Sequence, residues 1–598
     1  MKRKLLINIY SFISNKQEWL IFLAILIIAV FLRLAGVAWD QNQHLHPDER
    51  YMTMVASEIS WPSSLSEYLN PETSSLSPIN KGYDAYVYGT FPLFLVKATA
   101  DLVGDSNYNT IPLVGRVVSS VFDLGTLILL FWLGKKIFFK QIGLIAMALY
   151  AFAVSPIQHS HYFTVDNFLT FFIIVCFVLI VKFIFAVNAK KRWLLSLLGL
   201  AVGLGFALAC KYSAIYFLPI LIIVFAYLLV SEFGHSKKKA FGLFLFRSLI
   251  LLVGTYLVFR FLQPYFFANN NWLDFTINPK LQATLHTNYL IQKGEILFPP
   301  AWHWVNTQAF LYPLKNIALW GLGPPIFLSF VLGIGILLRE LFRKLKKQQF
   351  GQEIFIKTLI IIWIFTGFFA QAGNFTKEMR YFLFIMPFVV LLAGNGLAFL
   401  LKQNNMVFKL LALMAIVLSF FWAWAFIKIY LRDTTRVSAS LWMQQNIPAG
   451  SLLANEAWDD PMPVGIPQDR GIAVKSFSSF LMEVYNQDAR AKLQVLYQDL
   501  TKADYIILSS PRASWTIGRL PDKFPIMFKY YQYLDSGEMG FNKVKEVSSF
   551  PEFFGLKIDD SPADEAFWVF DHPKVRIYQK TKNLTWEEFQ ALFAEINF

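Results

Sequence analysis

Long apolar runs recur through the first 430 residues and leave the chain few possible folds. A helix needs about 20 apolar residues to cross the hydrocarbon core of a bilayer, and runs of 18 or more are typical of such helices. The first run has no small-residue cleavage site, so we predict a spanning helix there and not a signal peptide. We therefore predict a polytopic α-helical membrane protein with about 11 transmembrane helices, at residues 18–38, 113–134, 141–158, 167–187, 193–210, 213–231, 240–261, 316–338, 354–372, 381–401 and 407–429.

Basic residues gather in alternate loops between these runs. Cytoplasmic loops carry an excess of Lys and Arg, so this pattern predicts a cytoplasmic N-terminus. An odd number of spans then places the C-terminal region outside, and we expect a bacterial plasma membrane. The basic loops are Lys2-Arg3-Lys4, Lys135-Lys136, Lys190-Lys191-Arg192, Lys237-Lys238-Lys239 and the run from Arg339 to Lys347.

Most chemically interesting residues fall in the segments that this topology places outside. These segments are 39–112, 159–166, 262–315 and 373–380, and the first of them is too long to be a simple connection. Stretches 49–59 and 91–103 have an amphipathic pattern that predicts interfacial helices. The side of the protein that carries the functional site is therefore expected to be extracytoplasmic.

The composition changes to that of a water-soluble domain after residue 430. From Arg432 onward the chain has 18 basic and 22 acidic residues, so the net charge of +14 comes from the membrane part. We predict domains at 1–430 and 431–598, the second a small α/β domain without a phosphate-binding glycine loop or a nucleophile elbow. Expected strands are Ser451–Asn455, Tyr505–Ser509, Phe567–Asp571 and Val575–Tyr578, and expected helices are Thr435–Asn446, Asp488–Leu496 and Thr585–Glu595.

Two classes of site are disfavoured. Basic loops threaded between spans do not form the continuous basic face that nucleic-acid binding requires. The two cysteines, Cys176 and Cys210, both fall in apolar runs. Neither a disulfide framework nor a Cys/His metal spacing is present in the sequence, so no metal site is expected.

An acidic pair follows the first span, in His46-Pro-Asp48-Glu49. Adjacent side chains in regular structure do not face one substrate together. One carboxylate acting alone suits a single displacement, in which a general base takes a hydroxyl proton while a good leaving group departs. We predict Asp48 as this base; an Asp at the start of an interfacial helix also serves as a simple cap.

Three more ionisable residues lie at the outer ends of spans. Asp166 begins one span, and an acidic group at membrane depth usually faces a partner or a cavity. Lys211 and Arg380, the latter followed by Tyr381, are cations on the outer face against the usual charge bias. An anionic ligand such as a phosphate explains this placement, and so does snorkelling of the side chains toward headgroups.

The outer loop 262–315 contains Trp302 and His303. Aromatic planes beside polar groups suit sugar rings, and they suit a membrane interface equally well. Nucleotide-activated sugars and ATP are not found outside the cytoplasm. A group-transfer enzyme on that side therefore needs an activated donor from the membrane itself, and a sugar on a lipid phosphate meets this need.

These features together resemble the GT-C superfamily of polyprenyl-phosphate-sugar-dependent glycosyltransferases, in the branch of protein O-mannosyltransferases and lipid A aminoarabinose transferases. The acidic pair at Asp48 and Glu49 matches the family's first outer loop. Asp166, in Phe163-Thr-Val-Asp-Asn-Phe-Leu-Thr, matches its second acidic site. Arg380-Tyr381 and Gly115-Arg-Val-Val-Ser-Ser also look family-like, and the resemblance covers about residues 18–430.

The resemblance implies an inverting transferase that moves one sugar from a polyprenyl-phosphate donor to a hydroxyl on a protein, glycolipid or polysaccharide acceptor. Asp48 is the implied base and Asp166 a supporting acid, with Glu49 as the third catalytic candidate. No cofactor or essential metal is expected. Arg380, Lys211, His46, Tyr381, Trp302 and His303 are the expected substrate-binding residues.

One departure from the family concerns the donor phosphate. The aminoarabinose branch has Lys-Pro-Pro-Leu where this chain has Thr90-Phe-Pro-Leu93. Arg380 or Lys211 would have to replace the lost cation. Two alternatives stay open: a transporter or flippase of a lipid-linked sugar, for which repeated halves are expected but not seen, and a non-catalytic assembly or receptor subunit.

Overall fold

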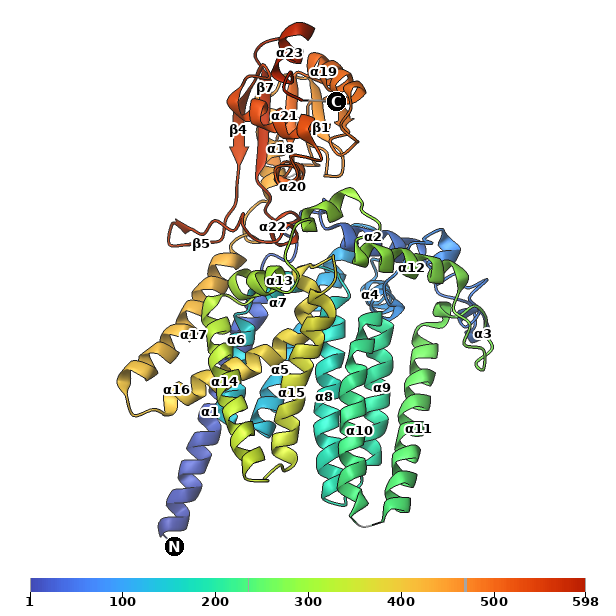
Figure 1. Ribbon diagram of the computed structural model, residues 1–598, viewed down its shortest axis with the longest axis vertical. Coiled ribbons are helices and arrows are strands. Elements are labelled where there is room, and N and C mark those ends of the chain that lie inside the picture. Colours follow the sequence, from blue (N-terminus) through green and yellow to red (C-terminus); the bar gives the residue numbers. More distant parts are fainter. Residues whose placement is uncertain (1, 235, 467–469, 597–598) are drawn as a thin grey trace. The chain divides into compact units, whose positions relative to one another are not determined.

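The computed structural model describes residues 2–234, 236–466 and 470–596, with side chains from residue 16 onward. The chain divides into two units (Figure 1). The first unit holds residues 1–37, 47–293 and 308–424, and the second holds residues 38–46, 294–307 and 425–598. The predicted domains, 1–430 and 431–598, stay a prediction.

The first unit is a bundle of apolar helices. Within the described ranges, nine helices are long and apolar enough to cross a membrane. They are α1 (Lys2–Leu34), α5 (Ile111–Ile137), α8 (Asp166–Asn188), α10 (Leu218–Phe233) with the 3₁₀ turn η2 (Tyr212–Phe217), α11 (Lys237–Leu262), α14 (Pro324–Lys346), α15 (Gln352–Ala372), α16 (Met386–Lys402) with η6 (Met379–Ile385), and α17 (Met406–Ile427).

Two of the predicted spans are less regular. Helices α6 (Lys140–Ala151) and α7 (Val154–Ser160) form one apolar pair bent by 57°, which raises the number of spans to ten if the pair crosses as one. Helix α9 (Leu194–Cys210) is apolar but shorter than the others. Each of the eleven apolar runs thus overlaps a helix of the bundle and the fold class is confirmed, while the number of eleven spans stays a prediction.

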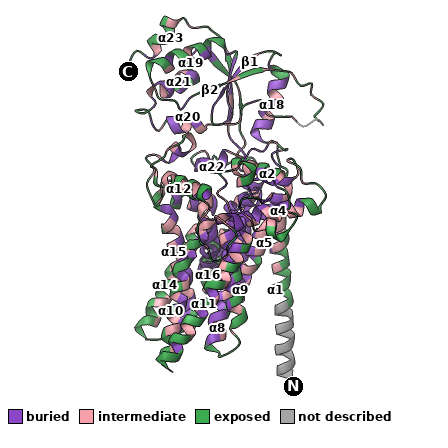
Figure 2. Cartoon of the chain, turned by 90° about the vertical axis from the view of Figure 1, so that its right-hand side faces the viewer, coloured by how far each residue is buried: buried purple, intermediate pink, exposed green. Residues whose placement is uncertain are grey.

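Alternating helix directions place the ends of several helices on the same side of the bundle. At this side of the bundle α2 (Pro47–Glu58), α8 and η6 begin. The helices that end there are α1, α7, α9, α11 and α15. The most enclosed spans are those that start at Met379 and Asp166, with 83% and 67% of their apolar window buried, against 11% for α11. Figure 2 shows this buried interior in purple. The helices that carry candidate residues at their ends are therefore the best packed.

Glycine allows the closest helix contact in the bundle. A Cβ atom at Gly333 of α14 would lie 1.8 Å from the Leu392 carbonyl oxygen of α16, and one at Gly396 would lie 2.3 Å from the Ser329 oxygen. Small residues let helix backbones approach where side chains would keep them apart. This contact holds α16 in place, and it therefore also holds η6, the turn that precedes α16.

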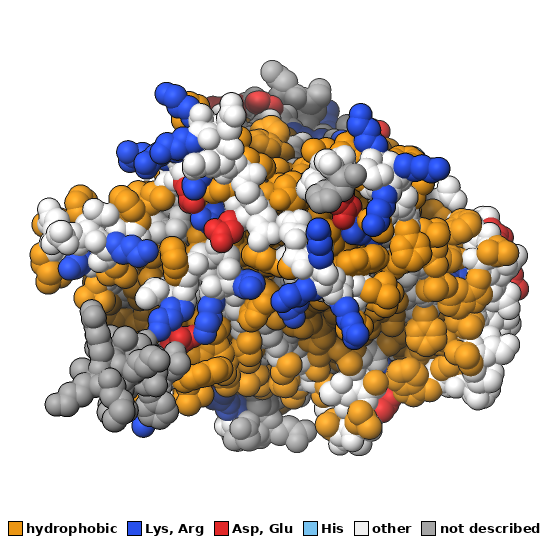
Figure 3. Space-filling model, turned by 90° about the horizontal axis from the view of Figure 1, so that it is seen from below, with side chains coloured by type: hydrophobic (Ala, Val, Ile, Leu, Met, Phe, Trp, Pro, Cys, Tyr) orange, Lys and Arg blue, Asp and Glu red, His pale blue; other side chains and the backbone are white. Residues whose placement is uncertain are grey.

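The opposite end of the bundle is basic. Figure 3 looks at this end and shows many Lys and Arg side chains among apolar ones, with few acidic side chains. The loops that turn there carry the basic clusters predicted from the sequence, such as Lys190-Lys191 and Lys237-Lys238-Lys239, which are exposed. The basic end and the end that carries Asp48 therefore lie on opposite sides of the bundle.

Shorter helices occupy the connections on the side of Asp48. The two amphipathic stretches form α2 and α4 (Thr90–Leu102), as predicted. The others are α3 (Leu65–Tyr68), η1 (Ile79–Lys81), η3 (Pro264–Phe266), α12 (Pro279–Lys293), α13 (Leu311–Asn316) and the π-helical turn η5 (Ile317–Gly321).

The second unit contains a five-stranded sheet in the order β2-β1-β3-β7-β4. Strands β2, β1 and β3 are parallel, and β7 is antiparallel to both β3 and β4. Alternate residues of β3 face opposite layers. Ile506 packs with α19 (Arg490–Lys502), α21 (Pro525–Ser536) and α23 (Trp586–Leu592), whereas Ile507 packs with α18 (Thr435–Asn446). The strands are β1 (Leu452–Glu456), β2 (Ser478–Met482), β3 (Tyr505–Leu508), β4 (Phe541–Val547) and β7 (Val575–Lys580).

The three helices predicted for this unit are present, while α20 (Arg512–Ile517), α21 and α22 (Glu565–Trp568) were not predicted and one predicted strand is wrong. Residues 567–571, predicted as a strand, instead contain the end of α22, because Asp564 caps that helix by accepting from the Ala566 amide. Strands β2 and β4 were not predicted, since each presents mostly exposed residues. The helices are η4 (Pro299–Trp304), α18 (Thr435–Asn446), α19 (Arg490–Lys502), α20 (Arg512–Ile517), α21 (Pro525–Ser536), α22 (Glu565–Trp568) and α23 (Trp586–Leu592).

Candidate active site

Asp48 lies in the first turn of α2 and forms an ion pair with Arg380, through Oδ2 and Nη1. Arg380 also forms an ion pair with Glu378 through its Nε. The first turn of η6 thus places one guanidinium between two carboxylates. Sequence reasoning predicted Asp48 and Arg380 but missed Glu378, which gave no motif signal.

Asp166 and Lys211 form a second ion pair, with the Lys211 Nζ 2.7 Å from the Asp166 Oδ1. Asp166 is the first residue of α8, and the residue before it, Val165, is the N-cap. Lys211 follows the last residue of α9 in extended backbone. The two helix ends therefore place opposite charges in contact.

Tyr381 connects the two ion pairs. The Lys211 Nζ lies 4.9 Å from the centre of the Tyr381 ring, and the Arg380 guanidinium carbon lies 5.5 Å from it. Cations at this distance from an aromatic face are attracted by the ring. Asp48, Asp166, Lys211, Arg380 and Tyr381 form one cluster, although Asp48 and Arg380 lie 332 residues apart in the sequence.

The members of this cluster differ in exposure. The side chains of Asp48, Arg380 and Lys211 are 20%, 16% and 23% exposed, whereas that of Asp166 is 4% exposed. A reacting group must be reachable, and a supporting group need not be. The geometry therefore favours Asp48 over Asp166 as the residue that meets a substrate.

Tyr88 is a further member that sequence reasoning missed. Its hydroxyl forms a hydrogen bond with Asp48. Burial raises the pKa of Tyr88 well above its usual range, and the Asp48 charge raises it further. The hydroxyl therefore keeps its proton at neutral pH and donates to the carboxylate. The repeated tyrosines in Tyr83-Asp-Ala-Tyr-Val-Tyr88 were the signal that could have found it.

Gly89 holds the loop of Tyr88 against the end of α9. Its amide donates to the Cys210 carbonyl oxygen at 3.0 Å. A Cβ atom at Gly89 would lie 1.9 Å from the Ala209 oxygen, so a side chain does not fit there. This close contact joins the loop of Tyr88, whose hydroxyl bonds with Asp48, to Cys210, the residue before Lys211.

Glu49 points away from this cluster into a buried ion pair. Arg116 of α5 binds it through both Nη2 and Nε, the latter 3.0 Å from the Glu49 Oε2. The Phe163 amide donates to the same oxygen at 2.7 Å. Both charged side chains are fully buried. These contacts hold α2 against the bundle, so Glu49 has the surroundings of a structural residue.

Thr90, at the position where the related branch has a lysine, is engaged in hydrogen bonds. Its amide and hydroxyl both donate to the Gln263 Oε1, at 2.6 and 2.8 Å. The Gln263 Nε2 donates in turn to the Tyr212 hydroxyl at 2.7 Å. A polar network, with no cation among these three residues, occupies this position.

The remaining predicted residues lie in the second unit. The His46 ring packs on Phe570 with centroids 4.5 Å apart, and Trp302 packs on Phe524 at 4.9 Å. The His303 Nδ1 lies 3.4 Å from a Glu565 carboxylate oxygen. Burial lowers the pKa of His303, but Glu565 and Asp564 outweigh burial, so the pKa is raised overall. Substrate roles for His46, Trp302 and His303 stay predictions.

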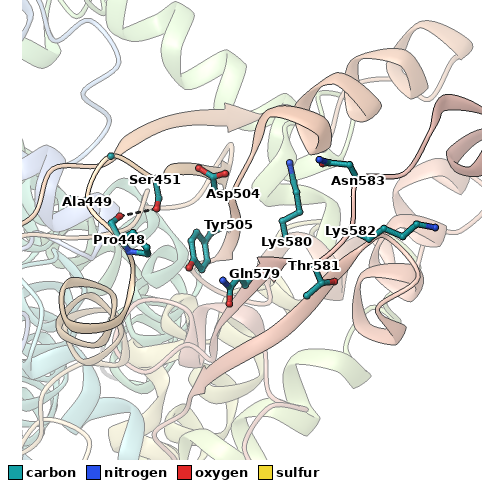
Figure 4. Close-up of a pocket in the computed structure, with 11 residues that line it drawn as sticks. Pro448, Ala449, Ser451, Asp504, Tyr505, Gln579, Lys580, Thr581, Lys582 and Asn583 are labelled. Carbon is teal, nitrogen blue, oxygen red and sulfur yellow. Dashed lines mark hydrogen bonds between the residues drawn. The ribbon is translucent and has the colours of Figure 1, made fainter.

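A metal site and a pocket in the second unit are two further possibilities for ligand binding. In the described part of the chain, no group of three or more His, Cys, Asp and Glu is arranged to hold a metal ion. A pocket of 560 Å³ in the second unit is lined by Ser451, Asp504, Tyr505, Gln579 and residues near them (Figure 4). It contains none of the predicted site residues.

One region of the chain matches a known glycosyltransferase family model. Residues 74–265 match the family model described as dolichyl-phosphate-mannose-protein mannosyltransferase. This range includes Tyr88, Arg116, Asp166 and Lys211. No curated protein matches the chain by sequence.

The chain is similar to several solved structures. The archaeal oligosaccharyltransferase AglB from Archaeoglobus fulgidus, in complex with an inhibitory peptide and a dolichol-phosphate, is 13% identical, with 86% of this chain and 72% of that chain covered at a TM-score of 0.50. ArnT from Cupriavidus metallidurans, bound to undecaprenyl phosphate, is 12% identical over 83% and 94%, with a TM-score of 0.43. The O-mannosyltransferase complex of S. cerevisiae, bound to the sugar donor, is 18% identical over 41% and 33%, with a TM-score of 0.32.

The resemblance to the GT-C superfamily is confirmed by the matched region and the fold. The chain is an integral membrane protein with the fold of the AglB oligosaccharyltransferase.

Proposed function

We propose that the protein transfers one sugar from a polyprenyl-phosphate donor to an acceptor hydroxyl, with inversion at the anomeric carbon. The cluster of Asp48, Arg380, Tyr381, Lys211 and Asp166 carries this proposal. It combines a reachable carboxylate with two cations at one end of a membrane bundle, in a chain with a mannosyltransferase sequence region. We further propose that this end is extracytoplasmic, in line with the basic residues at the other end.

The two cations are the proposed binding site for the donor phosphate. A guanidinium has five N–H donors, and the ion pairs of Arg380 with Asp48 and Glu378 engage Nη1 and Nε. The Nη2 donors suit a third anion. Lys211 has three donors and shares one with Asp166. A lipid phosphate is an anion that suits both, and the related AglB structure contains a dolichol-phosphate.

Asp48 is the proposed general base. The acceptor oxygen attacks the anomeric carbon on the face opposite the phosphate, and Asp48 takes the hydroxyl proton. The bond between that carbon and the phosphate oxygen breaks, and its electron pair leaves with the polyprenyl phosphate. Tyr88 donates a hydrogen bond to Asp48 and orients its carboxylate. General-base assistance typically contributes roughly 10²–10⁴ in rate.

The other predicted residues take supporting roles. Asp166 holds Lys211 in position, and Glu49 fixes the first turn of α2 through Arg116. A divalent metal is not required in this scheme. His46, Trp302 and His303, together with the second unit, are proposed to contact the acceptor, which is a protein, glycolipid or polysaccharide.

The test uses purified protein in detergent with a panel of labelled polyprenyl-phosphate sugars and envelope extracts as acceptors. We expect release of free polyprenyl phosphate and transfer of label to one acceptor class, with and without a chelator. A transporter of lipid-linked sugars would yield no product, because detergent removes the membrane. Absence of product across the whole panel would contradict the proposed function.

A further inference from the structure

A short hairpin in the second unit presents large apolar side chains to solvent. Strands β5 (Glu552–Phe553) and β6 (Leu556–Lys557) pair antiparallel and stand apart from the main sheet (Figure 1). Phe554 at the tip is 88% exposed, and Leu556 is 72% exposed. Apolar side chains that are exposed together at one tip indicate a surface that a membrane or another molecule covers.

The turn of this hairpin keeps a phenylalanine where turn geometry disfavours one. Phe554 and Gly555 have φ angles of 46° and 84°, as in a two-residue turn with both residues left-handed. Asn-Gly and Asp-Gly are the usual pairs for this turn, since a bulky residue at positive φ is strained. Strain of this kind is typical of positions that serve a function. The strained turn therefore marks Phe554 as a candidate functional residue.

Chain connectivity keeps the hairpin close to the end of a membrane span. The Arg432 Nη2 lies 3.0 Å from the Glu552 Oε2, at the base of the hairpin. Arg432 follows Ile427, the last residue of α17, by five residues. Five extended residues reach at most about 17 Å. The actual reach is shorter, because the amides of Ile429 and Tyr430 donate to Phe426 and Ile427 in turns.

Basic side chains surround the hairpin base. Arg432, Lys428 and Lys557 all lie close enough to Glu552 to lower its pKa, with the hydrogen bond from Arg432 as the largest cause. Lys574 lies 5.7 Å from the centre of the Phe550 ring. Aromatic and aliphatic groups flanked by Lys and Arg are the composition of segments that lie in the headgroup region of a bilayer.

We propose that the hairpin of residues 552–557 inserts its tip into the membrane interface beside α17. Phe554 and Leu556 enter the boundary between headgroups and acyl chains, and the basic residues contact lipid phosphates. The second unit is then held to the membrane at two points, the end of α17 and the hairpin tip. This inference does not depend on the transferase proposal.

The test places an environment-sensitive fluorophore at the tip. Native Cys176 and Cys210 are both fully buried, so a thiol-reactive NBD label goes to a newly introduced cysteine. Phe554→Cys and Leu556→Cys are labelled separately in the full-length protein, in nanodiscs containing anionic lipid. Val495→Cys on α19, where Val495 is 52% exposed, is the matched control.

We expect the NBD emission of both tip variants to be blue-shifted against the control, and to be quenched by nitroxide groups placed shallowly on the lipid chains. Water-like emission at the tip would overturn the proposal. A blue shift without quenching by lipid nitroxides would also overturn it, since it indicates burial against protein. So would a blue shift that persists in detergent and rises with protein concentration, which indicates contact with a second copy.

Discussion

Arg380 forms an ion pair with Asp48 although 332 residues separate them in the chain. Asp48 stands at the start of α2, just after the first span, and Arg380 in η6 begins a much later one. The contact joins α2, which follows the first described span, to the start of the second-to-last one. It also places the proposed base next to the proposed phosphate ligand.

Removing Lys211 should weaken donor binding. In Lys211→Met the phosphate loses one charge-assisted hydrogen bond, worth about 1.5–3 kcal/mol, so the KM for the donor rises about 10- to 150-fold. Lys97→Met is the control, because Lys97 also pairs with an aspartate, 3.3 Å from Asp101. An unchanged KM in Lys211→Met would remove Lys211 from the phosphate site.

Removing the hydroxyl of Tyr88 should slow the chemical step. Tyr88→Phe deletes the hydrogen bond that orients Asp48, so kcat falls roughly 10- to 100-fold while the KM for the donor stays the same. Tyr83→Phe serves as control, since the Tyr83 hydroxyl bonds with Glu58. Equal kcat values in the two variants would show that Tyr88 does not position the base.

Breaking the Glu49 ion pair should reduce stability. Glu49→Gln leaves Arg116 buried without its carboxylate, and removing one partner of such a pair costs about 3–5 kcal/mol of unfolding free energy. In the control Glu18→Gln the partner Lys135 is 47% exposed, so the loss is below about 1 kcal/mol. The measurement is denaturant unfolding in detergent. Equal stability in both variants would contradict the assignment of Glu49.

The second unit should lose stability in alkaline solution. Burial alone would lower the pKa of His572, but Asp571 and Asp560 outweigh burial and raise the pKa to about 10. The unfolded value is about 6.5. Because the folded value is the higher one, this contribution is complete below about pH 6.5 and is lost as pH rises toward 10.

Thermal unfolding between pH 6.5 and 10 measures this effect. The midpoint of the wild-type protein should fall more steeply over this range than that of His572→Gln, which has no charge to lose. Parallel slopes for the two proteins would show that His572 is not the titrating group.

The sequence predicted the spans and the charged residues at their ends well, because both follow from the cost of polar groups in a bilayer. It also predicted Asp48, Arg380 and Lys211 without showing that they meet. That contact depends on how α2, α9 and η6 pack, and such packing has no local signal. Tyr88 was missed for the same reason, since it acts through the distant Asp48. Glu378 was missed because it gave no motif signal, although its partner Arg380 is only two residues away.

Short segments of the second unit were harder to predict. The apolar residues of 567–571 fit a strand by composition, but the Asp564 cap makes a helix there. Strands β2 and β4 lie at the two edges of the sheet, where exposed polar residues hide the usual alternation.

The rate of a single turnover in Asp48→Asn, at saturating donor, tests the central claim most directly. Asn keeps the size of the side chain but cannot take a proton from the acceptor, so the rate should fall roughly 10²–10⁴-fold while donor binding is retained. Glu378→Gln, which removes the other carboxylate on Arg380, should keep most of the rate. A wild-type rate in Asp48→Asn would show that Asp48 is not the base and would contradict the proposed mechanism.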